Sequence, residues 1–150
     1  MKRLKVSTAS MVLVDSSVWI EAARREGDLL CKAALRALLE EYEATTCSPV
    51  LLEVLGGARK AERKEMQEYF SIIPHISAGP LDWKEALQHA WKLRDKGHHV
   101  PWNDLLIATI ALRRSLRVYA KDKHFELMGR VLDLSLYQPG YGGSYNSGKE

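Results

Sequence analysis

The chain reads Met11-Val12-Leu13-Val14-Asp15 near its start, directly followed by Ser16-Ser17-Val18-Trp19, and this stretch decides the fold. Four consecutive apolar residues, two of them valines, predict a short strand buried on both faces, which is typical of a parallel sheet covered by helices. Open α/β folds bind their ligands at the carboxyl edge of such a sheet. We therefore expect Asp15, at the end of this strand, to lie at a functional site.

The remainder of the chain alternates strand and helix patterns. Further strands are expected at residues 44–47, 72–76, 117–120 and 131–136, and helices over 17–25, 29–42, 48–55, 61–70, 80–96, 102–112 and 122–128. The helix over 102–112 is apolar all round and should lie deep in the core. Ser48 is expected to cap the helix that it precedes, and Pro74 favours an edge position for its strand. This alternation predicts an α/β protein, a three-layer α/β/α sandwich with a mainly parallel sheet.

Composition fits one soluble domain. The 150 residues are 46% hydrophobic, and the net charge of +3 permits a polyanionic partner without requiring one. Cys31 and Cys47 lack metal-ligand spacing and should be reduced and buried. The longest uncharged apolar stretch, 105–112, is too short to cross a bilayer, so we expect a cytoplasmic protein. The domain should span residues 11–136, between a leader at 1–10 and a glycine-rich disordered tail at 137–150.

Four acidic residues stand where a solvated surface charge is not expected. They end a buried strand, interrupt an apolar helix, begin the most apolar helix and follow the strand at 117–120: Asp15, Glu53, Asp104 and Asp122, in that order. Burying a carboxylate without a partner is costly or forces it to bind a proton. Three of the four positions are strand ends or helix starts, which a parallel sheet brings to one edge. We therefore expect the four side chains to converge.

Each carboxylate also has a structural alternative. Asp122 and Asp104 could stabilise the N-terminus of a helix, each by about 1 kcal/mol or less. Asp15 could be a turn residue at the end of its strand. Glu53 has the weakest alternative, because a glutamate gains nothing from an apolar helix face. Convergence is favoured because these alternatives would otherwise have to hold at all four places at once.

A convergent cluster needs a counter-charge. Two carboxylates about 4 Å apart repel each other by roughly 4 kcal/mol at an effective dielectric constant of 20. Ligand sets made only of oxygen favour hard ions, so Mg²⁺, with Mn²⁺ as a substitute, is expected rather than Zn²⁺. The histidines show no ligand spacing and are expected to be surface or structural residues.

Four stretches of the chain together resemble the motifs of PIN domains, and most closely those of VapC-like toxins of type II toxin–antitoxin pairs. They are VDSSVWI (14–20), SPVLLEV (48–54), NDLLIATIA (103–111) and KDKHF (121–125). The resemblance covers about residues 11–136 in the family's order. It implies a PIN-like nuclease domain with metal-dependent endoribonuclease activity on RNA. It also implies a homodimer that a VapB-like antitoxin holds inactive.

The resemblance gives the four acidic residues their roles. It implies that Asp15, Asp104 and Asp122 hold Mg²⁺, directly or through water, and that Glu53 completes the cluster or orients the attacking water. The reaction would be hydrolysis of RNA phosphodiester bonds that leaves 5′-phosphate and 3′-hydroxyl ends. All four carboxylates are therefore candidate catalytic residues.

Smaller features of the motifs add supporting residues and one departure. The small hydroxyl residue that follows the first aspartate in the family is matched by Ser16 or Ser17. Lys123 is our candidate for contacting RNA backbone phosphates, because it lies beside Asp122. Ala120 stands where the family often has Thr or Ser. This departure keeps open a second interpretation, a non-catalytic PIN-like scaffold that binds RNA or protein.

Overall fold

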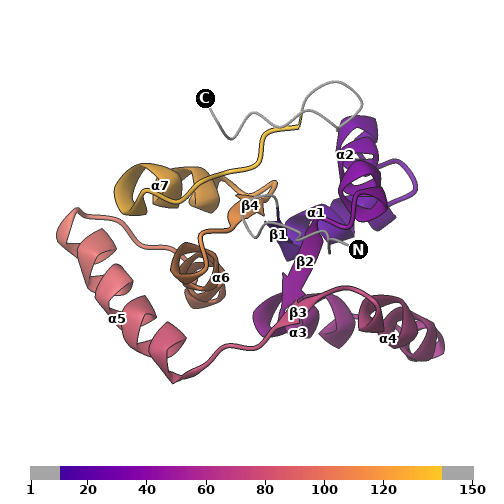
Figure 1. The fold of residues 1–150 in the computed structure, drawn as a ribbon, viewed down its shortest axis with the longest axis horizontal. Coiled ribbons are helices and arrows are strands. Elements are labelled where there is room, and N and C mark those ends of the chain that lie inside the picture. The colour runs from indigo at the N-terminus through magenta and orange to yellow at the C-terminus, as the bar shows by residue number, and fades with distance from the viewer. Residues whose placement is uncertain (1–10, 140–150) are drawn as a thin grey trace, which may run out of the picture.

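The computed structural model describes residues 11–139, and a four-stranded parallel sheet forms its centre (Figure 1). The strands are β1 (Val12–Val14), β2 (Ala44–Cys47), β3 (His75–Ile76) and β4 (Arg117–Tyr119), in the order β3-β2-β1-β4. β1 pairs with both β2 and β4, so that Val12 lies opposite Ala44 and Arg117. All three residues of β1 are completely buried. The predicted central strand is therefore confirmed.

Helices cover both faces of this sheet. In the described range they are α1 (Ser16–Ala23), α2 (Leu29–Glu40), α3 (Ser48–Gly56), α4 (Arg63–Ser71), α5 (Pro80–Asp95), α6 (Trp102–Arg113) and α7 (Lys123–Leu132), with a 3-10 turn, η2 (Lys60–Glu62). Figure 1 shows α1 and α2 on one side of the strands and α5, α6 and α7 on the other. This confirms the three-layer α/β/α fold. The residues 104–111 of α6 are buried without a break, as its apolar sequence predicts.

The chain order brings three strand ends and three helix starts to one edge of the sheet. α1 follows β1 directly, α3 follows β2 directly, and α7 follows β4 after a short loop. β1 has β2 on one side and β4 on the other, and this reversal of strand order marks the ligand-binding edge of open α/β folds. The backbone N–H of Asp15 donates to the carbonyl of Tyr119 at 2.9 Å, which joins the ends of β1 and β4.

The last helix is longer than the sequence analysis predicts. The helix expected over 122–128 continues to Leu132, because Phe125, Met128 and Leu132 lie on one buried face at helical spacing. The strand predicted at 131–136 is therefore wrong. Of that stretch, Leu136 alone pairs with the sheet, in an isolated parallel bridge to Val118.

The packed chain continues past residue 136. Tyr137 is buried, and its backbone N–H donates to the carbonyl of Val118 at 2.8 Å. Its ring also meets that of Tyr119 edge to face, with the ring centroids 5.1 Å apart. The predicted leader and most of the predicted tail, residues 1–10 and 140–150, lie outside the described residues.

The structure confirms the edge position of the strand that follows Pro74 and contradicts the cap predicted at Ser48. β3 is a two-residue edge strand, shorter than the predicted 72–76 but at the edge that Pro74 favours. The capping role predicted for Ser48 is wrong, because Cys47 occupies the N-cap position and no side chain caps the helix there. The Ser48 hydroxyl instead lies 3.2 Å from Nε2 of His75 on the neighbouring strand.

Cys31 and Cys47 are buried and form no disulfide, as the sequence predicts. Burial raises the pKa of the Cys47 thiol to about 12, so it behaves as a small apolar side chain. Within residues 11–139, none of the helices has the length and apolar character needed to cross a membrane.

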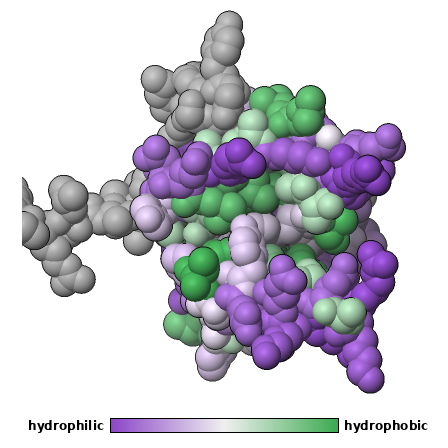
Figure 2. Space-filling model, turned by 90° about the vertical axis from the view of Figure 1, so that its right-hand side faces the viewer, coloured by the Kyte–Doolittle hydropathy of each residue, from purple (hydrophilic) through white to green (hydrophobic). Residues whose placement is uncertain are grey.

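Within residues 11–139, at least two apolar grooves are open on the surface. One, of about 440 Å³, lies between α1, α2 and α4, and Figure 2, which views this side of the molecule, shows apolar surface between bands of hydrophilic side chains. It is lined chiefly by Trp19, Ala22, Leu35, Val54, Met66 and Tyr69. The other, of about 580 Å³, lies between α5 and α6 and is lined chiefly by Trp83, Leu87, Trp91, Val100, Trp102 and Leu106. Exposed apolar surface of this kind is typical of sites that protein partners cover.

A buried aspartate joins α5 to α6. The Asp82 carboxylate is 0% exposed and accepts hydrogen bonds from Arg113 and Arg114, both at 2.8 Å. It also accepts one from the backbone N–H of Gly79 at 2.8 Å. The hydrogen bonds from Arg114 are the main reason why the pKa of Asp82 lies well below its ordinary value. Asp82 therefore stays ionised, and paired with the two arginines, at every pH near neutrality.

Asp82→Asn should lower the free energy of unfolding by about 3 kcal/mol, because it leaves two arginines without their buried counter-charge. In a chain of this size that corresponds to a fall in Tm of about 6–12 °C, measurable by thermal denaturation at pH 7. Glu85→Gln is the matched control, since Glu85 lies 3.7 Å from Arg113 at the surface. The control should change stability by less than about 0.5 kcal/mol. Equal effects of the two variants would contradict the role assigned to Asp82.

Candidate metal centre

Asp15 lies between β1 and α1 and is only 2% exposed. One carboxylate oxygen, Oδ2, accepts the backbone N–H of Ser17 at 3.1 Å and its hydroxyl at 2.6 Å, so Asp15 caps α1. The other oxygen, Oδ1, is buried and accepts no hydrogen bond within the described residues. Burial raises the pKa of Asp15, with a smaller contribution from the charge of Glu53, while the hydrogen bonds from Ser17 oppose the shift. The residue therefore both caps a helix and leaves one oxygen for another partner.

Asp104 occupies the first turn of α6 and is 7% exposed. Burial raises its pKa to about 7, and the negative charges of Asp15, Asp122 and Glu53 contribute to the rise. His124 acts in the opposite direction. Asp104 is thus the carboxyl group whose ionisation the other three carboxylates oppose together.

Glu53 projects from α3 at the rim of the cluster. Its Oε1 accepts a hydrogen bond from the Ser16 hydroxyl at 2.9 Å. The prediction that apolar groups surround Glu53 is wrong, because its side chain is exposed. α3 buries only Pro49 and Val50, so the remaining apolar residues of this helix do not enclose Glu53.

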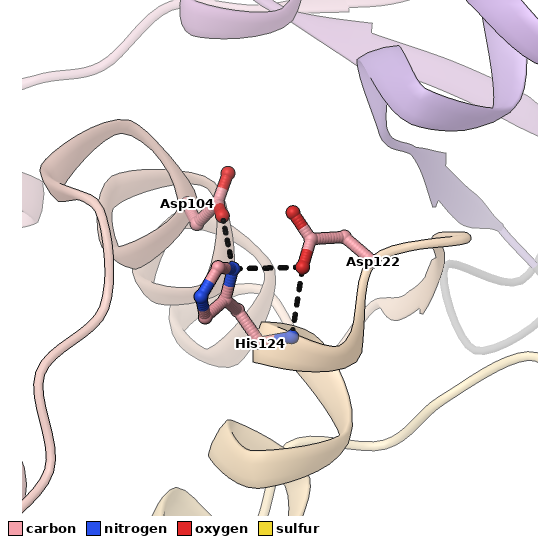
Figure 3. A group of neighbouring side chains, drawn as sticks. All are labelled: Asp104, Asp122 and His124. Atoms are coloured by element: carbon pink, nitrogen blue, oxygen red, sulfur yellow. Dashed lines mark hydrogen bonds and ion pairs between the residues drawn. The ribbon is translucent and has the colours of Figure 1, made fainter.

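Asp122 precedes α7 and caps it, since its Oδ1 accepts the backbone N–H of His124 at 2.9 Å. The same oxygen lies 2.7 Å from Nδ1 of the His124 ring, and Oδ2 of Asp104 lies 3.4 Å from that nitrogen. Figure 3 shows the ring of His124, from α7, turned toward both carboxylates. The structure thus brings a histidine into the cluster.

Sequence reasoning missed His124, because it treats all the histidines as surface or structural residues. The available signal was position rather than ligand spacing. A residue two places after a capping aspartate lies on the first turn of the helix, beside the cap. Because Asp122 is itself a candidate, His124 beside it in the first turn is a candidate ligand as well.

The candidate residues form two overlapping groups of possible metal ligands. Asp15, Glu53 and Asp104 offer one set of atoms within 4.8 Å of one another, and Asp104, Asp122 and His124 offer a second. The predicted convergence of the four carboxylates is therefore observed. The buried oxygen of Asp15 without a hydrogen-bond donor and the raised pKa of Asp104 both fit a site that holds a cation.

The supporting residues differ in how they reach the cluster. The Ser17 hydroxyl donates to Asp15 and accepts the backbone N–H of Lys121 at 2.9 Å. The ammonium group of Lys121 is paired with Asp28 at 2.7 Å. Lys123 is exposed and makes no ion pair within the described residues, which leaves its charge available to a ligand in solution.

Asp104→Asn should stabilise the protein in EDTA, and more so at pH 8 than at pH 5. The pKa of Asp104 rises on folding from 3.8 to about 7, so the folded state holds a proton that the unfolded state releases between these values. Stability of the wild type is therefore lost as the pH rises through this window. Since one pKa unit corresponds to about 1.4 kcal/mol, the difference in unfolding free energy should widen by at least about 1 kcal/mol. Chemical denaturation at both pH values measures it, and a variant less stable than the wild type at both would indicate a purely structural Asp104.

Comparison with known proteins identifies relatives of this chain. The chain is 28% identical over 128 residues to Ribonuclease VapC11 of Mycobacterium tuberculosis (strain H37Rv), in an alignment that covers 83% of this chain and 96% of the relative. The solved structure of VapBC2 from Rickettsia felis, bound to a DNA fragment from its promoter, matches with a TM-score of 0.69 and 20% identity. That match covers 84% of this chain and 96% of the other.

A second solved structure, VapC20 of Mycobacterium tuberculosis, described as a toxin that cleaves the sarcin-ricin loop, matches with a TM-score of 0.59 and 20% identity. It covers 79% of this chain and 95% of that one. At such identities these structures show a shared fold. The family model of the PIN domain matches residues 12–131, which contain all four acidic residues and His124. The chain therefore belongs to the PIN domain family.

Proposed function

We propose that this chain is a metal-dependent endoribonuclease, the toxin of a toxin–antitoxin pair, which hydrolyses RNA phosphodiester bonds. The observation that carries the proposal is the meeting of four carboxylates from distant parts of the chain, one of them with a buried oxygen that lacks a hydrogen bond. Membership of the PIN domain family and similarity to VapC ribonucleases support it.

Asp15, Asp104 and Asp122 are the residues that would hold the metal ion, and Mg²⁺, with Mn²⁺ as substitute, suits their oxygen atoms. When bound, the ion neutralises negative charge on the phosphate and makes a water molecule more acidic. In this proposal Ser17 fixes Oδ2 of Asp15 and leaves Oδ1 as the ligand atom. Asp104, whose pKa is raised to about 7, would hold the cation in its deprotonated form.

Glu53 is the residue best placed to orient the attacking water. It is exposed, so solvent reaches it, and the Ser16 hydroxyl holds its Oε1. The second oxygen, Oε2, would accept a hydrogen bond from that water. Lys123, exposed next to Asp122, would contact a backbone phosphate and make RNA binding depend on salt concentration.

Asp104→Asn should reduce cleavage of a mixed RNA pool in Mg²⁺ or Mn²⁺ by about 100-fold or more, the order found when a charge-stabilising group is removed from an active site. EDTA should abolish cleavage by the wild type. Gel analysis of the products measures both effects. Asp95→Asn is the matched control, since Asp95 is exposed at the end of α5, and it should retain wild-type activity.

The same assay decides the second candidate, a PIN-like scaffold that binds RNA or protein without cutting it. Ala120, where the family often has a hydroxyl residue, is the feature that favours this candidate. Undiminished cleavage by Asp104→Asn would count against the proposed centre. RNA binding without cleavage in either metal ion would favour the scaffold.

We propose two protein partners, a VapB-like antitoxin and a second copy of the chain. Similarity to solved structures of VapB–VapC complexes supports the antitoxin. The groove between α5 and α6 supports the homodimer, because it is apolar and exposes Trp83, Trp91 and Trp102. Tryptophans are enriched where protein subunits meet.

Trp91→Glu should convert a dimer into a monomer, because it places a charge in the apolar groove between α5 and α6. Sedimentation velocity of the purified chain measures the change. Leu29→Glu is the control, since Leu29 is also apolar and exposed but lies at the start of α2, outside that groove. Dimers of both variants would show that the interface lies elsewhere.

A further inference from the structure

The two groups of possible ligands in the acidic cluster differ in chemistry. Asp15, Glu53 and Asp104 offer only carboxylate oxygens, which suit Mg²⁺. The second group, Asp104, Asp122 and His124, adds an imidazole nitrogen, which Mg²⁺ accepts poorly and transition-metal ions accept well. Since Asp104 belongs to both groups, one centre combines two ligand sets with different preferences.

The position of His124 suits a metal ligand. Its Nδ1 lies 2.7 Å from Oδ1 of Asp122 and 3.4 Å from Oδ2 of Asp104, and Figure 3 shows it facing both. The atom is buried, yet it makes no aligned hydrogen bond to either oxygen. A ring held only as a donor would point its N–H along one of these contacts. The three atoms lie within 4.8 Å of one another, close enough to bind one cation together.

An independent observation indicates that a cation or hydrogen-bond donor is missing from this cluster. Asp15, 2% exposed, keeps its Oδ1 without a hydrogen bond, and its carboxylate lies within 4.8 Å of a ligand atom of Asp104. A buried carboxylate oxygen of this kind is costly unless a cation or donor meets it. Asp104 therefore borders an unsatisfied group on one side and His124 on the other.

We propose that Nδ1 of His124 is a metal ligand, and that the set formed by Asp104, Asp122 and His124 binds a divalent transition-metal ion in preference to Mg²⁺. The inference rests on the proposed metal-dependent function and adds the nitrogen ligand to it. The centre would then hold Mg²⁺ through its carboxylates and favour ions such as Mn²⁺ through a single ring nitrogen. His124 thereby determines which ions the centre selects.

The test uses Mn²⁺ bound to the full-length chain without a histidine tag. Electron spin-echo spectroscopy of the bound Mn²⁺ should show coupling to a nitrogen-14 nucleus in the wild type. His124→Asn, which keeps an oxygen atom near the place of Nδ1, should lose the coupling and bind Mn²⁺ about tenfold or more weakly, while Mg²⁺ affinity changes less than about threefold. His99→Asn is the matched control and should keep both properties, since His99 is exposed and contacts Trp102 instead.

The outcomes separate this inference from the proposed function. Bound Mn²⁺ without nitrogen coupling, or coupling that persists in His124→Asn, overturns the inference, and RNA cleavage in Mg²⁺ then leaves the proposed function intact. Absence of both ion binding and cleavage overturns the two together. His124→Phe, which keeps a ring of similar size without a ligand atom, is the second variant and should give the same loss. A loss of Mg²⁺ affinity as large as that of Mn²⁺ would also contradict the selective role.

Discussion

Repulsion between carboxylates that a rigid core holds together is the constraint on which the rest of the structure depends. Asp15 cannot withdraw, because it follows the completely buried β1, and Asp104 cannot withdraw, because the residues 104–111 of α6 are buried. Burial raises the pKa of both carboxyl groups. The fold thus maintains an unfavourable concentration of negative charge at one edge of its sheet, a local loss of stability that is typical of sites kept for function.

The sequence predicts the features that depend on local pattern and on the geometry of parallel sheets. Val12-Leu13-Val14 predicts a buried central strand, and the apolar residues 105–112 predict the core position of α6, since neither segment has a polar face to expose. Asp15 and Asp122 reach the same edge of the sheet because both follow neighbouring parallel strands, and Asp104 lies close to each of them. Pro74 marks the edge strand because it lacks a backbone donor.

Other features depend on which surfaces meet in the folded chain, and a single sequence does not contain that information. Glu53 lies among apolar residues along the chain but is exposed, because only part of α3 faces the core. His124 reaches Asp104 because α7 packs against α6, a contact that the spacing of histidines does not predict. Leu132 continues a helix rather than starting a strand because its side chain shares a buried face with Met128, and an apolar residue is compatible with both.

The Ser17 hydroxyl links the two halves of the cluster mechanically. The Ser17 side chain bonds to Asp15 on one side and to the backbone of Lys121 on the other, next to Asp122. The loop after β4 and the first turn of α1 are therefore tied through a single oxygen atom. This link restrains how far the loop that leads to Asp122 can move from Asp15. A small hydroxyl side chain at this place thus acts on the dimensions of the centre, beyond its local bond to one carboxylate.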